Sequence, residues 1–278
     1  LIVVCAIYTF SVYFGMKGVQ LSAATCTWLF FGLLAYVFFF GGQTRFIIEE
    51  GITALGNLTQ NFIGLATWTD SLRTSSFPQT WTIFYWAYWM VWCVAVPFFI
   101  GSISKGRTLR QVILGGYVFG LSGTFTSFII MGNYGLGLQM HGKLDVLSTY
   151  AADGNLYHAI LDILGQLPLS KAVLVLLVLS MITFYSTSFD SITMVASTYT
   201  YKELKSDEEP HRNVKLFWAI FLILLPLALI FSENSMSNLQ TVSIIAAFPV
   251  GIIMLLIITS FFKDADAYLQ EQAHNSKS

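Results

Sequence analysis

Residues Trp81 to Trp92 read W-T-I-F-Y-W-A-Y-W-M-V-W, within a segment, Ser75 to Ser104, that contains no charged residue. An uncharged stretch of this length can cross a bilayer as an α-helix. Seven of the twelve quoted residues are aromatic. At about 100° per residue, six of the seven rings fall within an arc of roughly 140°, and only Trp86 stands apart. The stretch predicts a membrane helix with one aromatic face.

Two interpretations of this aromatic face are open from the residues alone. Ring faces attract cations, above all quaternary ammonium groups, which have no N–H to donate. Alternatively, Trp and Tyr anchor helices at membrane interfaces, and rings also pack between helices. The rise from Trp81 to Trp92 is about 16 Å, which is deeper than one interface. This distance argues against anchoring but leaves a cation site and packing as alternatives.

The whole chain has the composition of an integral membrane protein. Of its 278 residues, 55% are hydrophobic and 10% are charged, and the mean hydropathy is +0.68. Apolar runs of about 20 residues with a helical rhythm predict an all-α polytopic fold and exclude an outer-membrane barrel. The net charge of −1 says nothing about partners, and no basic patch in the sequence suggests a nucleic-acid partner. The scattered cysteines and histidines predict no disulfide, zinc site or cofactor.

We predict one membrane domain, residues 1–263, followed by a solvated tail, residues 264–278. Its seven membrane helices are expected at roughly 1–15, 24–45, 79–101, 111–133, 170–197, 214–231 and 240–262. Residues 46–66 have a helical apolar rhythm but too many polar residues to span, which predicts a helix lying on the membrane surface. Because Leu1 already lies in an apolar run, we expect a longer protein of which this is the C-terminal part.

The basic residues predict the orientation of these helices. If the loops alternate sides, one set holds ten of the fourteen Lys and Arg residues and the other set holds four. The positive-inside rule places the richer set in the cytoplasm. The C-terminus is then cytoplasmic, and the plasma membrane is the expected location.

A polar run, S-T-S-F-D-S, interrupts the predicted helix 170–197 at Ser186 to Ser191. Asp190 is ionisable at membrane depth, which by default indicates function. The hydroxyls of Thr187 and Ser188 are hard oxygen ligands that suit sodium. The alternative is structural: the hydroxyls bond to carbonyls one turn earlier, and Asp190 lies near the cytoplasmic end within reach of water.

Two long motifs carry a family resemblance. The run F-P-Q-T-W-T-I-F-Y-W-A-Y-W, Phe77 to Trp89, and the run I-S-K-G-R-T-L-R, Ile103 to Arg110, resemble the signature of the betaine/choline/carnitine transporters, the BCCT family. K-G-V-Q-L-S at Lys17 to Ser22 and T-S-F-D-S at Thr187 to Ser191 also fit. The resemblance covers essentially the whole chain, which would hold the last seven of the family's twelve helices.

The resemblance implies a fold and a substrate site. The family fold is a pair of inverted five-helix repeats with substrate and ions bound between them near mid-membrane. The family's aromatic box around the trimethylammonium group lies on the helix matched by Phe77 to Ile100. Carried over by position, the residues lining the site are Phe84, Tyr88, Trp89 and Trp92, with Trp81 nearer the outer vestibule. A homotrimer is also expected by resemblance.

The resemblance also addresses the coupling ion. Sodium-coupled members bind sodium with the hydroxyls of a T-S pair and a Phe carbonyl three residues earlier, which this chain matches with Phe184, Thr187 and Ser188. Sodium-independent exchangers replace the ion with an Arg on the helix after the K-G-V-Q-type loop, and this chain has no Arg between Lys17 and Arg45. Both observations favour sodium as the coupling ion, and no other metal ion is expected.

Three departures from the family pattern bear on function. Tyr88 stands where most members have Trp; its ring is a weaker cation–π partner, but its hydroxyl can bond a carboxylate or hydroxyl of the substrate. Cys93 to Ala95 replace a common S-P-F, which questions a second ion site there. Gly101 and Ser102 replace a common Ala-Arg at the inner end of the helix, where cytoplasmic gating is affected.

The expected function is secondary transport of a quaternary ammonium compound by alternating access, as sodium-coupled symport. A sodium-independent exchanger of carnitine against a related betaine is the nearest alternative, and a cation channel is another. No nucleophile–base pair or catalytic cluster is present in the sequence, so we do not expect an enzyme.

Overall fold

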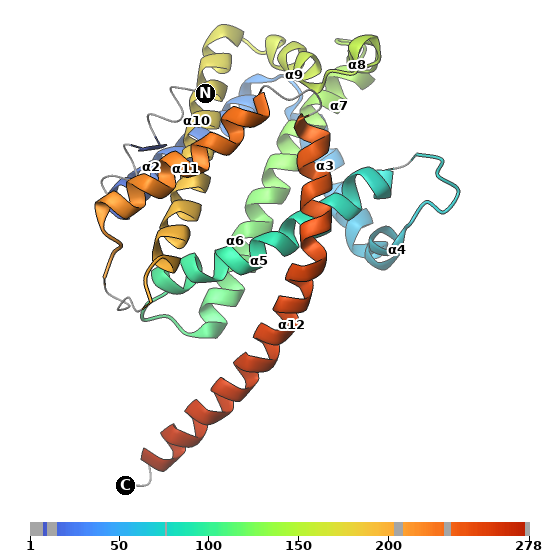
Figure 1. The fold of residues 1–278 in the computed structure, drawn as a ribbon. Coiled ribbons are helices and arrows are strands. Elements are labelled where there is room, and N and C mark those ends of the chain that lie inside the picture. Colours follow the sequence, from blue (N-terminus) through green and yellow to red (C-terminus); the bar gives the residue numbers. More distant parts are fainter. Residues whose placement is uncertain (1–7, 10–15, 76, 203–207, 231–234, 276–278) are drawn as a thin grey trace. The chain divides into compact units, whose positions relative to one another are not determined.

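The computed structural model describes residues 8–9, 16–75, 77–202, 208–230 and 235–275 (Figure 1). Every regular element in these ranges is a helix, which confirms the predicted all-α class. The chain divides into two compact units. Unit 1 comprises Leu1–Thr67 and Ser104–Leu222, and unit 2 comprises Trp68–Ile103 and Ile223–Ser278.

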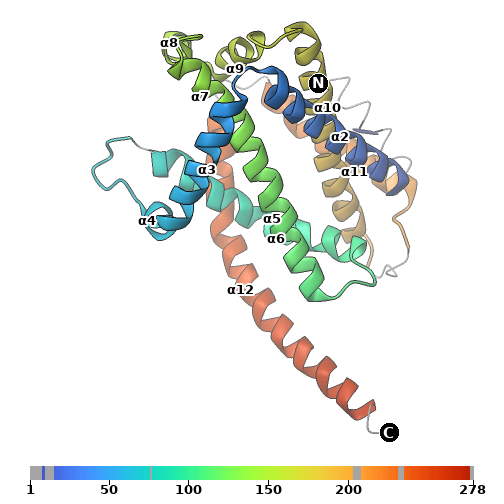
Figure 2. The ribbon, with the colours of Figure 1, turned by 180° about the vertical axis from the view of Figure 1, so that it is seen from behind.

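Unit 1 is built around a pair of long helices, α2 and α10, which pack against each other (Figures 1 and 2). The shorter helices α7, α8 and α9 gather at the end where α10 begins. The elements of unit 1 are α2 (Met16–Phe40), α3 (Thr44–Gln60), α4 (Phe62–Thr67), α6 (Leu109–Ser127), the π-helical turn η2 (Phe128–Gly132), α7 (Asn133–Met140), α8 (Val146–Asp153), α9 (Leu156–Gly165), α10 (Ser170–Tyr199) and the first part of α11 (Arg212–Ile230).

The core of unit 1 joins five of these helices and the segment between α9 and α10. Its buried residues are Leu33 and Val37 of α2, Ile47 of α3, Tyr134 and Leu138 of α7, Leu164 of α9, Leu167, and Val173 of α10. The hydroxyl of Tyr36 donates a hydrogen bond of 2.5 Å to the carbonyl of Pro168. The second half of α2 is therefore fixed against the start of α10.

Two glycines follow the end of α2 at Phe40, one packed under a ring and the other in a left-handed turn. A Cβ atom on Gly41 would lie 2.7 Å from Cε2 of Tyr134, which is closer than such atoms approach. Gly42 has a φ of +67°, a left-handed conformation that glycine adopts without strain. The predicted helix 24–45 therefore ends earlier than expected, and it also begins earlier, at Met16.

Unit 2 is built around α5 and α12, which pack against each other. Its elements are the π-helical turn η1 (Pro78–Thr82), α5 (Ile83–Ile103), the last part of α11 and α12 (Ser235–Asn275). α12 begins before the predicted span 240–262 and continues as a helix through most of the predicted tail.

Four described helices have the length and hydropathy to cross a membrane, which confirms a polytopic membrane fold. They are Gln20–Phe40, Leu109–Met140, Ser170–Tyr199 and Gln240–Asn275. The predicted spans 79–101 and 214–231 are helices but are not among these four. The predicted surface segment 46–66 is helical in α3 and α4, and the predicted helix 1–15 lies outside the described residues except for Tyr8 and Thr9.

Candidate substrate and ion sites

The aromatic helix starts with a π-helical turn. Pro78, which is buried, opens η1, and the chain passes into α5 at Ile83 without a break. A π turn holds more residues than an α turn, so it rotates less per residue. Trp81 lies within η1 and does not follow the 100° step assumed for a straight α-helix from residue 79. The helix that the sequence predicted here is present.

The structure brings four of the five predicted substrate residues into one connected set of rings, the aromatic cluster Phe84, Tyr88, Trp89 and Trp92. Tyr88 is the central ring: its centroid lies 5.7 Å from that of Phe84, 5.9 Å from Trp89 and 6.0 Å from Trp92. The ring planes of Trp89 and Trp92 are inclined to that of Tyr88 by 80° and 62°. The cluster therefore presents ring faces in several directions.

Trp81, the fifth predicted residue, does not contact the aromatic cluster directly. Its ring stacks on Tyr85 at a centroid distance of 6.1 Å, and Tyr85 in turn lies 5.5 Å from Phe84. Trp81 therefore lies one turn before the cluster along the helix.

The opposite face of α5 packs on α12, where a glycine allows close approach. Ala87 is buried, and a Cβ atom on Gly251 of α12 would lie 3.0 Å from the sulfur of Met90. Met90 lies about 160° around the helix from Tyr88, and Ala87 about 140° from Trp92. Within unit 2 the aromatic cluster is therefore on the side of α5 away from α12, and Trp89 keeps 63% of its surface exposed.

A closed loop precedes the aromatic helix, and no motif in the sequence predicts it. The carboxylate of Asp70 accepts four hydrogen bonds of 2.8–3.1 Å, from the backbone N–H and the hydroxyl of both Thr74 and Ser75. The side-chain amide of Gln79, in η1, donates to the carbonyl of Thr69 at 2.8 Å. Asp70 has a φ of +44° and is buried. The loop is thus tied at both ends beside the start of α5.

The predicted ion ligands lie within one turn of α10 in unit 1. The hydroxyl of Ser188 donates to the carbonyl of Phe184 at 3.1 Å, and the hydroxyl of Thr187 donates to the carbonyl of Thr183. The structural alternative, bonding to the preceding turn, is therefore present. A hydroxyl that donates its proton keeps lone pairs on oxygen, so this bonding is compatible with cation binding. Ser188 is exposed and Thr187 half-buried within the described chain.

A second polar face of α10 is fully buried. The side chains of this buried polar stripe, Ser186, Asp190, Thr193 and Ser197, are each 0% exposed. Tyr8 forms a hydrogen bond with Thr193, and its ring lies 5.5 Å from that of Phe189. The four stripe residues share an arc of about 60°, and Ser188 lies about 160° around the helix from Asp190. Asp190 is thus out of reach of water and on a different face from Ser188.

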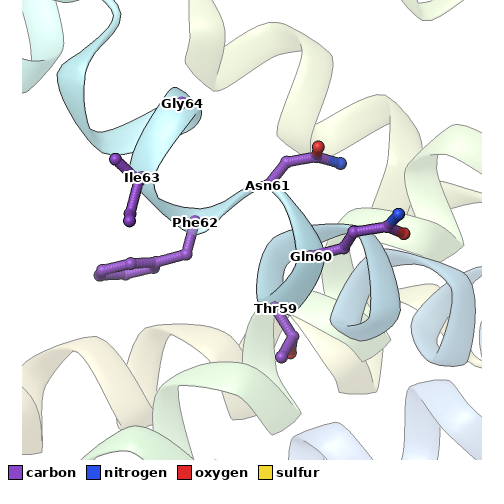
Figure 3. Close-up of a pocket in the computed structure, with 6 residues that line it drawn as sticks. All are labelled: Thr59, Gln60, Asn61, Phe62, Ile63 and Gly64. Atoms are coloured by element: carbon purple, nitrogen blue, oxygen red, sulfur yellow. The ribbon is translucent and has the colours of Figure 1, made fainter.

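One surface hollow lies where α3 passes into α4 (Figure 3). It is lined by Thr59, Gln60, Asn61, Phe62, Ile63 and Gly64. The side chains of Phe62 and Ile63 point to one side of the junction and those of Gln60 and Asn61 to the other. Six consecutive residues form this hollow, which reflects the bend of the chain and brings no distant functional groups together. Among the described residues, no three His, Cys, Asp or Glu side chains could jointly hold a metal ion.

These features define a helical, polytopic membrane protein with an aromatic face suited to an organic cation and a separate face of hydroxyl oxygens. The sequence profile of BCCT, the betaine/carnitine/choline family transporter, matches residues 1–270. The chain belongs to this family, which confirms the resemblance seen in its motifs.

Three curated relatives illustrate the similarity. The chain is 30% identical over 258 residues to the carnitine transporter of Acinetobacter baumannii, covering 92% of this chain and 46% of that protein. It is 30% identical over 264 residues to the probable glycine betaine transporter of Desulfitobacterium hafniense, covering 94% and 51%. It is 29% identical over 254 residues to the osmo-dependent choline transporter BetT2 of Acinetobacter baylyi, covering 89% and 36%. The chain thus spans about half the length of the curated relatives it matches.

Proposed function

We propose that the protein carrying this chain is a secondary active transporter of quaternary ammonium compounds such as glycine betaine, choline or carnitine. The observation that carries this proposal is the aromatic cluster, in which Tyr88 contacts three other rings on the side of α5 away from α12. A trimethylammonium group donates no N–H hydrogen bond, so ring faces can replace its water shell. Each ring contributes about 0.5–2 kcal/mol.

The names of the relatives agree with this substrate class. Carnitine, glycine betaine and choline are the compounds in the printed names of three different relatives, and all three carry a trimethylammonium group. A site that recognises this group alone would accept all of them. The choice among them then depends on polar groups elsewhere in the site.

Transport by the full-length protein is proposed to be sodium-coupled symport by alternating access. The carbonyl of Phe184 and the hydroxyls of Thr187 and Ser188 offer three oxygens within one turn of α10, and oxygen ligands suit a hard cation. Sodium bound there would stabilise the outward-open arrangement. Coupling requires that the ion prefers one arrangement over the other, because binding without such a preference shifts nothing.

The protein is proposed to lie in the plasma membrane with its C-terminus in the cytoplasm and to assemble as a homotrimer. The orientation rests on the distribution of basic residues, and the trimer rests on family resemblance. A reporter fused after Ser278 that is active only in the cytoplasm tests the orientation: activity is expected, and a reporter active only outside contradicts it.

The full-length protein in liposomes tests the function. Uptake of radiolabelled glycine betaine, choline and carnitine is measured with and without an inward sodium gradient, and empty liposomes serve as the control. Saturable uptake that collapses without the sodium gradient is expected. Uptake that ignores sodium but rises with internal substrate indicates an exchanger, and flux that never saturates indicates a channel.

A further inference from the structure

We propose that Tyr88 is the residue that selects, among trimethylammonium compounds, those with a hydroxyl or carboxylate oxygen close to the nitrogen. This inference rests on the function proposed above for the aromatic cluster. It adds a specificity for the polar end of the substrate, which ring faces alone do not provide.

The first argument is the central position of Tyr88. Its ring lies within 6.0 Å of the rings of Phe84, Trp89 and Trp92. A cation held by any two neighbouring rings of the cluster is therefore close to Tyr88. The steep inclination of both indole planes to the Tyr88 ring, 80° and 62°, is suited to enclosing a compact group from more than one side.

The second argument is the polar inventory of the cluster. Phe84 has no polar side-chain atom, and the indoles of Trp89 and Trp92 each offer an N–H that can only donate. The Tyr88 hydroxyl both donates and accepts, so within the cluster it alone can bond either a carboxylate or a hydroxyl. No residue in the described parts of the chain forms a hydrogen bond with it, and the side chain is 36% exposed.

The third argument is reach. In choline and carnitine the hydroxyl stands two carbons from the nitrogen, and in glycine betaine the carboxylate carbon is the second carbon. A phenol hydroxyl lies at the edge of the ring whose face contacts the ammonium group. When the ammonium group of such a ligand contacts the face of the Tyr88 ring, the oxygen of the ligand can therefore reach the Tyr88 hydroxyl. The separation of nitrogen and oxygen in the ligand is comparable with the separation of the ring face and the hydroxyl in Tyr88.

Tyr85 provides a matched control on the same helix. It is also a tyrosine with an exposed ring, and it belongs to the same predicted aromatic face of the helix. Its ring contacts are with Trp81 and Phe84, and it contacts neither indole of the cluster. The substitution Tyr85→Phe therefore removes the same phenol hydroxyl as Tyr88→Phe, but one helical turn away from the centre of the cluster.

The experiment compares Tyr88→Phe and Tyr85→Phe in the purified full-length protein. Equilibrium binding is measured with four radiolabelled ligands: tetramethylammonium, which has no oxygen, choline, glycine betaine and carnitine. Tyr88→Phe is expected to weaken the three oxygen-bearing ligands by about tenfold and to leave tetramethylammonium unchanged. Tyr85→Phe is expected to leave all four unchanged. Loss for choline and carnitine but not for glycine betaine identifies the hydroxyl as the group recognised, and loss confined to glycine betaine identifies the carboxylate.

Two results would overturn the proposal. One is that Tyr88→Phe weakens all four ligands equally or none of them, and the other is that Tyr85→Phe gives the same selective loss. Trp89→Ala separates this failure from that of the proposed function. If Trp89→Ala binds tetramethylammonium as the wild type does, the cluster is not the cation site and both proposals fall. If it loses tetramethylammonium while Tyr88→Phe does not discriminate, only the specificity proposal falls.

Discussion

The two helices that carry the candidate sites, α5 and α10, distribute their faces in opposite ways. On α5, Met90 lies against Gly251 of α12, and the aromatic cluster is left on the other side of the helix within unit 2. On α10, four polar side chains, those of Ser186, Asp190, Thr193 and Ser197, are fully buried, whereas Ser188 on another face is exposed. Residue type alone therefore does not identify a binding face, because the fold decides which chemistry remains accessible.

The difference has a physical reason. Leaving an aromatic ring half exposed costs little free energy, whereas burying a polar group is unfavourable unless that group is hydrogen-bonded. The buried polar stripe of α10 is consistent with that requirement at Thr193, which bonds Tyr8. This makes the stripe a structural element that holds Tyr8 against α10, and it leaves the face of Thr187 and Ser188 as the candidate for ion binding.

The strongest test of this division is the double variant Thr187→Val, Ser188→Ala. Each removed oxygen would cost about 1.5–3 kcal/mol if it contacts sodium, so the sodium concentration for half-maximal uptake is expected to rise more than tenfold. Uptake into liposomes at a series of sodium concentrations measures it. Thr198→Val is the control, because the Thr198 hydroxyl bonds only the Met194 carbonyl of its own helix. An unchanged sodium dependence would assign both hydroxyls to helix structure.

The buried polar stripe should respond in stability and not in sodium dependence. Thr193→Val removes the partner of the Tyr8 hydroxyl, and both side chains are buried. The free energy of unfolding is expected to fall by about 1–3 kcal/mol, which thermal melting of the purified protein would show as a lower Tm. Thr198→Val carries the same substitution at a local hydrogen bond and should melt close to the wild type. If the two variants melt together, the Tyr8 contact does not stabilise unit 1.

The open face of α5 should respond in substrate affinity. Trp89→Ala removes one ring of the aromatic cluster, and the expected loss is about 0.5–2 kcal/mol, or roughly 2- to 30-fold in the dissociation constant of choline. Trp86→Ala removes an equally large and exposed indole from outside the predicted aromatic arc. Equal losses in the two variants would show that rings on α5 act through helix packing and not through cation binding.

The sequence predicted the helices better than their ends and their neighbours. The 100° rule placed Phe84, Tyr88, Trp89 and Trp92 on one face, and these rings do lie in contact, because helical spacing is a local property. Trp81 lies in the π turn after Pro78, where each residue rotates less, and its ring stacks on Tyr85 of the same aromatic face. The end of α2 also depended on a distant contact, the ring of Tyr134 against Gly41.

The grouping of Ser186 to Ser191 shows a different limit. Residues that are close in the sequence point to different sides of a helix, so Asp190 and Ser188 belong to one polar run but lie on different faces. Only packing shows that the Asp190 side is covered. The closed loop at Asp70 depends on a left-handed residue that is not glycine, and no simple sequence pattern marks such a position.

A substitution in the loop at Asp70 is expected to have the smallest effect. It tests whether α5 is held in position by α12 alone. Asp70→Asn leaves one carbonyl oxygen where two carboxylate oxygens accept four hydrogen bonds. Loss of about 1 kcal/mol raises the open population of the loop about fivefold. Trypsin cleavage after Arg73, an exposed residue inside the loop, should accelerate by that factor because cleavage follows the open form. Cleavage after Lys143, in another loop, should keep its rate. If cleavage at Arg73 does not change, the carboxylate does not close the loop, and α5 takes its position from its packing on α12.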